Sequence, residues 1–104
     1  MPDPMRIRAT AQPDGGVDVR VLMSHEMETG QRRDGAGKLV PAHFISTVTV
    51  QHAGKTVLTA EWGPAVSKNP YLQFKFAGGK KGDELVVTWV DNKGETRTDK
   101  ATIN

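Results

Sequence analysis

Residues 44–62 of the chain have the sequence FISTVTVQHAGKTVLTAEW, and this stretch decides the fold class. Alternate positions on either side of the central HAGK turn are apolar: Phe44, Val48, Val50, Leu58, Ala60 and Trp62. A period of two is typical of a half-buried β-strand, and a short turn sequence that contains glycine is typical of a hairpin. The stretch therefore predicts two antiparallel strands joined by a tight turn.

The same alternation recurs on both sides of this hairpin. It is found in residues 5–11, 17–23 and 71–76, in the run that contains Leu85, Val87 and Trp89, and in the polar stretch 95–102. PDGG at residues 13–16 and DNKG at residues 91–94 predict two more hairpin turns, and GGKKG at residues 78–82 predicts a third hairpin loop. The sequence thus predicts seven strands.

Seven short strands in 104 residues predict an all-β fold, an immunoglobulin-like antiparallel β-sandwich of about seven strands. A small barrel is the alternative. The apolar positions of the alternating stretches form the predicted core: Ile7, Val19, Val21, Val48, Leu58, Trp62, Leu72, Phe74, Val87 and Trp89. The length predicts one domain over residues 1–104, with a core large enough to fold without disulfides.

Composition excludes several classes of function. The chain has no cysteine, which excludes thiolate catalysis, Cys-ligated zinc, iron–sulfur clusters and blue-copper sites. Its net charge is only +2 with mixed signs, so nucleic acid is not the expected partner. We find no stretch typical of a secretory signal and no apolar run of about 20 residues, and we therefore expect neither an export signal of its own nor a membrane span.

Two connections are longer than a sandwich needs, residues 24–43 and residues 63–69. Long loops often carry binding surfaces. The second loop is small and begins without charge, and Pro64 and Pro70 restrict its backbone. A stiff loop of this kind loses little entropy when it docks, which favours a role in partner binding.

The first loop also offers a metal hypothesis. Met23, His25, Met27 and His43 have the thioether and imidazole groups that suit copper, with Met5 or His52 as further candidates. The simpler interpretation is that Met23 belongs to the core and that the histidines fasten the loop by hydrogen bonds. The acidic residues Glu26, Glu28 and Asp34 lie among basic ones, so solvated ion pairs explain them better than acid–base catalysis does.

A third hypothesis is nucleic-acid binding. Arg6, Arg8 and Arg20 form a basic stripe on the outer face of the first hairpin. Asp18 interrupts this stripe, and no aromatic residue lies between its members in the sequence. An ordinary solvated surface therefore explains these arginines.

Five motifs in order make the chain resemble the SoxZ family. They are HEMETG at residues 25–30, PAHFI at 41–45, WGPAVSKNP at 62–70, FKF at 74–76 and WVDNKG at 89–94. One departure is Glu26, which stands where the family usually has proline, so the conformation of that loop is less fixed by the resemblance.

The resemblance implies an immunoglobulin-like subunit of the SoxYZ carrier complex in thiosulfate oxidation. It implies that the chain pairs with SoxY, whose C-terminal cysteine on a Gly-rich arm carries the sulfur intermediate, and that other Sox enzymes contact the complex transiently. It further implies a periplasmic location, reached by export bound to a signal-bearing SoxY. No catalytic residue of the family maps onto this chain, so we expect no enzyme activity, cofactor or metal.

A subunit of this kind contributes by holding its partner, and the two long loops are the candidate surface. The predicted partner-binding residues lie in these loops and at their bases: His25, Met27, Glu28, Thr29, Phe44, Trp62, Pro64, Val66 and Asn69. The alternative is that Trp62 and Phe44 belong to the core and that the loops only cap one end of the sandwich.

Overall fold

The computed structural model describes residues 3–104 and contains seven β-strands, as the alternation predicted. They are β1 (Arg6–Ala11), β2 (Gly16–Leu22), β3 (Ile45–His52), β4 (Lys55–Glu61), β5 (Tyr71–Ala77), β6 (Glu84–Asp91) and β7 (Thr96–Thr102). Residues 1 and 2 of the predicted domain lie outside the described part. Within it, no helix is long and apolar enough to cross a membrane.

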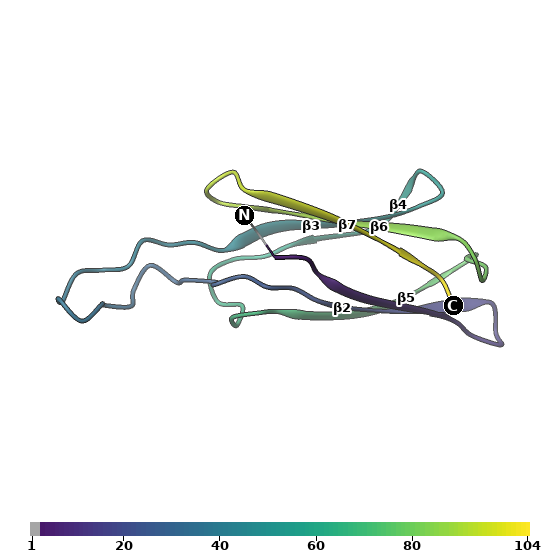
Figure 1. Cartoon of the computed structure of the whole chain (residues 1–104), viewed down its shortest axis with the longest axis horizontal. Coiled ribbons are helices and arrows are strands. Elements are labelled where there is room, and N and C mark those ends of the chain that lie inside the picture. Colours follow the sequence, from purple (N-terminus) through teal and green to yellow (C-terminus); the bar gives the residue numbers. More distant parts are fainter. Residues whose placement is uncertain (1–2) are drawn as a thin grey trace.

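The strands form two antiparallel sheets packed face to face (Figure 1). One sheet has the order β1-β2-β5 and the other the order β4-β3-β6-β7, which confirms an immunoglobulin-like sandwich. The hairpins β1–β2, β3–β4 and β6–β7 lie where turn residues predicted them. The hairpin predicted at residues 78–82 is wrong, because β5 pairs with β2 whereas β6 pairs with β3 and β7. That loop instead crosses from one sheet to the other.

The core lies between the inner faces of β1, β2, β3 and β6. Five of the predicted core residues are fully buried there: Val19, Val21, Val48, Val87 and Trp89. The other five predicted core residues pack against this core but stay partly exposed: Ile7, Leu58, Trp62, Leu72 and Phe74. Four of these five come from β4, β5 or the loop between them. Because β4 and β5 are edge strands, water reaches their inward side chains from the side.

One long side of the sandwich is closed by hydrogen bonds between the sheets. The amide of Ala11 donates to the carbonyl of Asn104 over 2.8 Å, and the amide of Asn104 donates to Ala9 over 2.9 Å. The amide of Met5 donates to the Asp99 carboxylate over 2.9 Å, and Ile103 is buried beneath the join. Among residues 3–104 no backbone hydrogen bond joins β4 to β5, so the opposite side is open.

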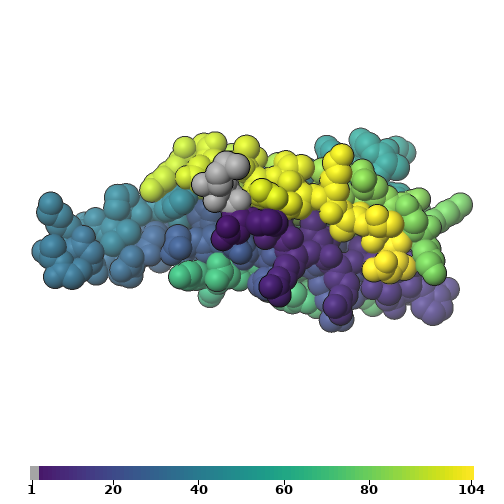
Figure 2. All heavy atoms as spheres, viewed as in Figure 1, coloured from purple at the N-terminus to yellow at the C-terminus, as the bar shows by residue number. Residues whose placement is uncertain are grey.

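The molecule is elongated. Its radius of gyration is 15.5 Å, whereas a compact domain of this length has about 13 Å. The extra length comes from residues 24–43, which extend as an arm well beyond the end of the sandwich (Figure 2). Every residue from 31 to 39 in this arm is exposed.

Candidate functional site

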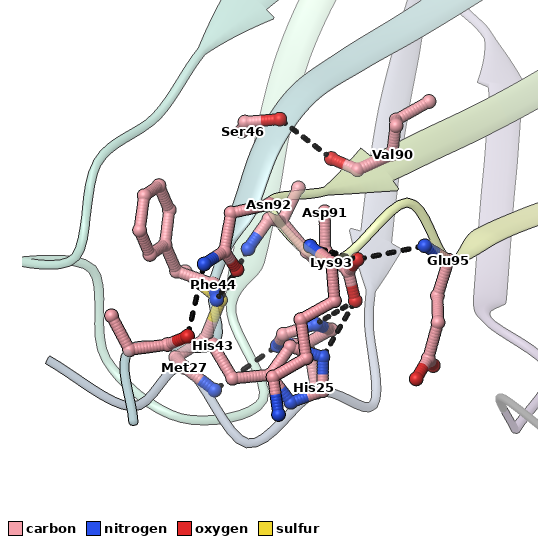
Figure 3. Close-up of polar contacts among 12 residues, drawn as sticks. His25, Met27, His43, Phe44, Ser46, Val90, Asp91, Asn92, Lys93 and Glu95 are labelled. Atoms are coloured by element: carbon pink, nitrogen blue, oxygen red, sulfur yellow. Dashed lines mark hydrogen bonds and ion pairs between the residues drawn. The ribbon is translucent and has the colours of Figure 1, made fainter. Parts of the chain in front are cut away.

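A cluster of two histidines and one aspartate, of which one histidine is only partly buried, lies at the end of the sandwich from which the arm leaves (Figure 3). His25 follows β2, His43 precedes β3, and Asp91 is the last residue of β6. The Nε2 atoms of His25 and His43 lie 3.0 Å and 2.6 Å from the same oxygen of Asp91, Oδ2. The two ends of the arm are thus joined to each other and to the core sheet through one carboxylate.

Asp91 accepts hydrogen bonds at both of its oxygens. The amides of Lys93 and Glu95 donate to Oδ1 over 3.0 Å and 2.9 Å, which also closes the β6–β7 turn. Burial raises the pKa of Asp91, but the hydrogen bonds from the two histidines and from these two amides together outweigh it. The pKa therefore lies below its ordinary value of 3.8, and the group is a carboxylate at neutral pH.

The backbone fixes the tautomer of His25. The amide of Met27 donates to Nδ1 of His25 over 3.0 Å, so Nδ1 holds the lone pair and Nε2 carries the proton that faces Asp91. Met27 itself adopts a left-handed backbone conformation, with φ of 50°. Such a conformation is costly for a residue other than glycine and is held here by its surroundings.

The copper hypothesis finds little support in this geometry. Met23 is fully buried in the core, and the sulfur of Met27 accepts a hydrogen bond from the amide of Ile45 over 3.3 Å. His25, His43 and Asp91 do offer three ligand atoms within 4.8 Å of one another. However, a histidine bound to metal through Nε2 keeps its proton on Nδ1, and that proton would face the amide proton of Met27. The cluster fits hydrogen bonding better than metal binding.

The arm has regular structure of its own. Glu28 and His43 exchange backbone hydrogen bonds of 2.6 Å and 3.0 Å at its base, and Asp34 forms the turn at its tip. Glu28 binds Arg32 through both carboxylate oxygens, and this contact holds the pKa of Glu28 below its usual value. This confirms the expected surface ion pair.

The second long loop, residues 63–69, is fastened to the first. The amide of Asn69 donates to the carbonyl of His25 over 2.9 Å, and the amide of His25 donates to Oδ1 of Asn69 over 3.0 Å. Thr29 and Gln31 of the arm and Pro64 and Ala65 of the second loop line one shallow hollow. The two loops that sequence reasoning selected therefore form one continuous surface.

The nine predicted partner-binding residues fall into three groups within this region. Thr29, Pro64 and Asn69 are exposed. Glu28, Phe44, Trp62 and Val66 are half-buried. His25 and Met27 are buried, with 8% and 5% of their surface exposed, so their side chains offer little surface to a partner.

Two residues that fasten the site were not selected from the sequence, where they formed part of a turn. One is Asp91, and the other is Asn92, which binds the backbone of Phe44 in both directions and donates to the carbonyl of Ala42 over 2.9 Å. The sequence pointed to them only through DNKG, which indicates a turn, and through the motif WVDNKG, and neither names the distant partners.

A further apolar surface runs from this end along the open side of the sandwich; we call it the seam. It consists of partly exposed inward side chains of β4, β5 and their connection: Leu58, Ala60, Trp62, Val66, Leu72, Phe74 and Phe76. Trp62 and Val66, which were predicted to bind a partner, lie in the loop that joins its two strands. The seam is continuous in the chain with the second loop, and hydrogen bonds between Asn69 and His25 fasten that loop to the arm.

Comparison with known proteins gives a family and a fold. A family model described as "Sulphur oxidation protein SoxZ" matches residues 5–102, nearly the whole chain. Among solved structures, a variant superoxide reductase (neelaredoxin) from Archaeoglobus fulgidus in its reduced form matches with a TM-score of 0.60 and 20% identity. The match covers 95% of this chain and 84% of that chain, and at this identity it shows the fold alone. No curated protein matches the sequence significantly.

Proposed function

Because the chain belongs to the SoxZ family and so has a role in sulfur oxidation, we propose that it is the non-catalytic subunit that binds SoxY in a SoxYZ carrier complex. In this complex SoxY carries the sulfur intermediate on its C-terminal cysteine. The chain has no cysteine, so the thiol that holds the sulfur comes from the partner. The proposal assigns no chemical step to this chain.

The seam is the observation that carries this proposal. Side chains that would be buried in a sandwich closed on both sides are half-exposed here, and they include three aromatic rings, Trp62, Phe74 and Phe76. Apolar patches of this kind at an open edge are typical of protein interfaces. The partner covers the seam and completes the core that β4 and β5 leave open.

The chain also exposes more surface than a compact monomer of its mass would. A monomer of 11.3 kDa exposes about 5,700 Å², whereas this chain exposes 6427 Å². The excess is roughly 700 Å². The arm and the seam are the features that depart from a compact shape, and we assign both, with the nine residues at their junction, to the contact with SoxY.

The proposed location is the periplasm, with export bound to a SoxY that carries the signal. Co-expression tests this. We expect the chain in the periplasmic fraction when signal-bearing SoxY is present and in the cytoplasm when the SoxY signal is deleted. Periplasmic accumulation without SoxY would contradict the export route while leaving the interface untouched.

The interface is tested by one valine pair. Val66→Asp puts a charge at the loop end of the seam, and Val90→Asp makes the same change at an exposed valine on the outer face of β6. We expect Val66→Asp to weaken SoxY binding at least tenfold by calorimetry and co-elution, while Val90→Asp binds as the unmodified chain does. Pro64→Asp, at an exposed position of the same loop, gives the same comparison if Val66→Asp fails to fold. Unchanged affinity in a folded variant of this loop would show that the interface lies elsewhere.

A further inference from the structure

The outer face of the β1-β2-β5 sheet is an ordered array of cationic and apolar side chains. The pairing of the three strands sets its outward residues in three rows. The rows are Arg6, Leu22 and Tyr71; Arg8, Arg20 and Gln73; and Thr10, Asp18 and Lys75. This face points away from the core and from the inward side chains that form the seam.

Positive charge is concentrated on this face. Its four cationic side chains and one carboxylate give a net charge of +3, whereas the whole chain carries +2. The carboxylate, Asp18, is already engaged. Gln73 donates to it over 3.2 Å and Arg20 over 3.0 Å, and these contacts hold the pKa of Asp18 below its usual value.

Two arginines on this face lack an anionic partner within the described chain. Neither Arg6 nor Arg8 makes an ion pair or a side-chain hydrogen bond among residues 3–104. In addition, Arg8 lies directly opposite Arg20 in the β1–β2 register. Like charges at opposite positions of antiparallel strands are destabilising, so an anion placed between them would be stabilising.

Apolar groups lie beside these charges. Tyr71 is 57% exposed and Leu22 is 42% exposed, which makes them two of the four large apolar residues exposed in the described chain. With Ile7 and the three arginines they line a shallow hollow of about 260 Å³. No aromatic residue lies between these arginines in the sequence, but strand pairing places Tyr71, 51 positions beyond Arg20, on the same face.

We propose that this face is a second docking surface, for an acidic segment of a protein partner other than SoxY. Its charge complements carboxylates, and tyrosine and arginine are among the residue types enriched at the energetic centres of protein interfaces. Tyr71 and Leu22 would contribute little to binding an inorganic anion. The net charge of only +2 on the whole chain does not favour a phosphate backbone. The surface does not depend on the proposed SoxY interface, since it uses the opposite face of the sheet.

The test uses the full chain labelled with ¹⁵N and three probes at low salt. The probes are a ten-residue peptide with four glutamates and two leucines, sodium sulfate, and a twelve-nucleotide single-stranded DNA. We expect the peptide to give saturable amide shifts confined to β1, β2 and β5. Arg6→Gln with Arg8→Gln should weaken this binding at least tenfold. The control, Lys81→Gln with Lys93→Gln, removes the same charge from exposed loops and should change the peptide affinity by no more than twofold.

Tyr71→Ala separates an acidic protein segment from other anions. We expect it to weaken the peptide at least threefold while leaving any response to sulfate unchanged. Three outcomes would overturn the proposal: equal peptide affinity in the two double variants, shifts with sulfate at the same concentrations as with the peptide, or tighter binding of the DNA.

Discussion

Replacing Asp91 by alanine should remove the fastening point of the arm. The substitution leaves two imidazole N–H groups and two backbone amides without their acceptor. The side chains of His25 and Asp91 are 3% and 0% exposed, so water does not readily replace the lost partner at Nε2 of His25. His43 is 18% exposed, and the amides of Lys93 and Glu95 lie in a surface turn, so these donors recover water in part.

The expected cost follows from these four contacts. Removing one member of a buried, hydrogen-bonded charged group costs about 3–5 kcal/mol, and we expect about 4 kcal/mol for Asp91→Ala. A domain of this length has a total stability of roughly 5–15 kcal/mol, so the variant would lose a large part of it. Asp91→Asn keeps the shape and one acceptor oxygen, and it should cost about half as much.

Urea unfolding followed by tryptophan fluorescence measures this change, because the ring of Trp89 lies 5.1 Å from that of His25. Asp83→Ala is the matched control. Asp83 also binds a histidine, His52, over 2.8 Å, but its side chain is 40% exposed. We expect the control to lose far less stability than Asp91→Ala. Equal losses of stability in the two variants would refute the idea that Asp91 contributes more than Asp83 because it is buried and shared by two histidines.

Three further predictions concern packing and pH. In Gly79→Ala the new Cβ would lie 2.6 Å from a methyl carbon of Val17, so we expect the variant to lose about 1–3 kcal/mol of folding stability. The control Gly35→Ala, whose Cβ meets nothing within 4 Å, should keep its stability, and equal thermal midpoints of the two variants would contradict this. Met27→Ala should cost about 2–4 kcal/mol in urea unfolding, because a buried side chain is lost, and a loss below 1 kcal/mol would place this residue outside the core. Because the pKa of Asp91 is lower in the folded state, its carboxylate stabilises the fold above the unfolded pKa near 4, and this stabilisation is lost as the pH falls below that value. The difference in unfolding free energy between the unmodified chain and Asp91→Asn should therefore shrink between pH 5 and pH 2, and a constant difference would contradict the lowered pKa.

The strands and hairpins were predictable from the sequence because their determinants are local. Alternation along residues 44–62 sets which side chains share a face, and the turn residues set where the chain reverses. Both long loops were located in the same way. The one incorrect hairpin, at residues 78–82, has the turn residues of a hairpin but joins two strands that belong to different sheets. Turn composition shows that the chain bends and does not show which strand it pairs with afterwards.

The tertiary structure alone decided which of these features become surfaces. Phe74 and Val87 both lie at inward positions of their strands, yet Val87 is buried because β6 is central and Phe74 is half-exposed because β5 is an edge. Likewise His25 and Asp91 are 66 positions apart, and only the packing of the two sheets brings their side chains to 3.0 Å. Alternation is a property of neighbouring residues, whereas burial and contact depend on the strands that lie alongside and opposite. Which strands become neighbours depends on the whole chain, because the fold must bury enough apolar area and satisfy the buried hydrogen-bonding groups.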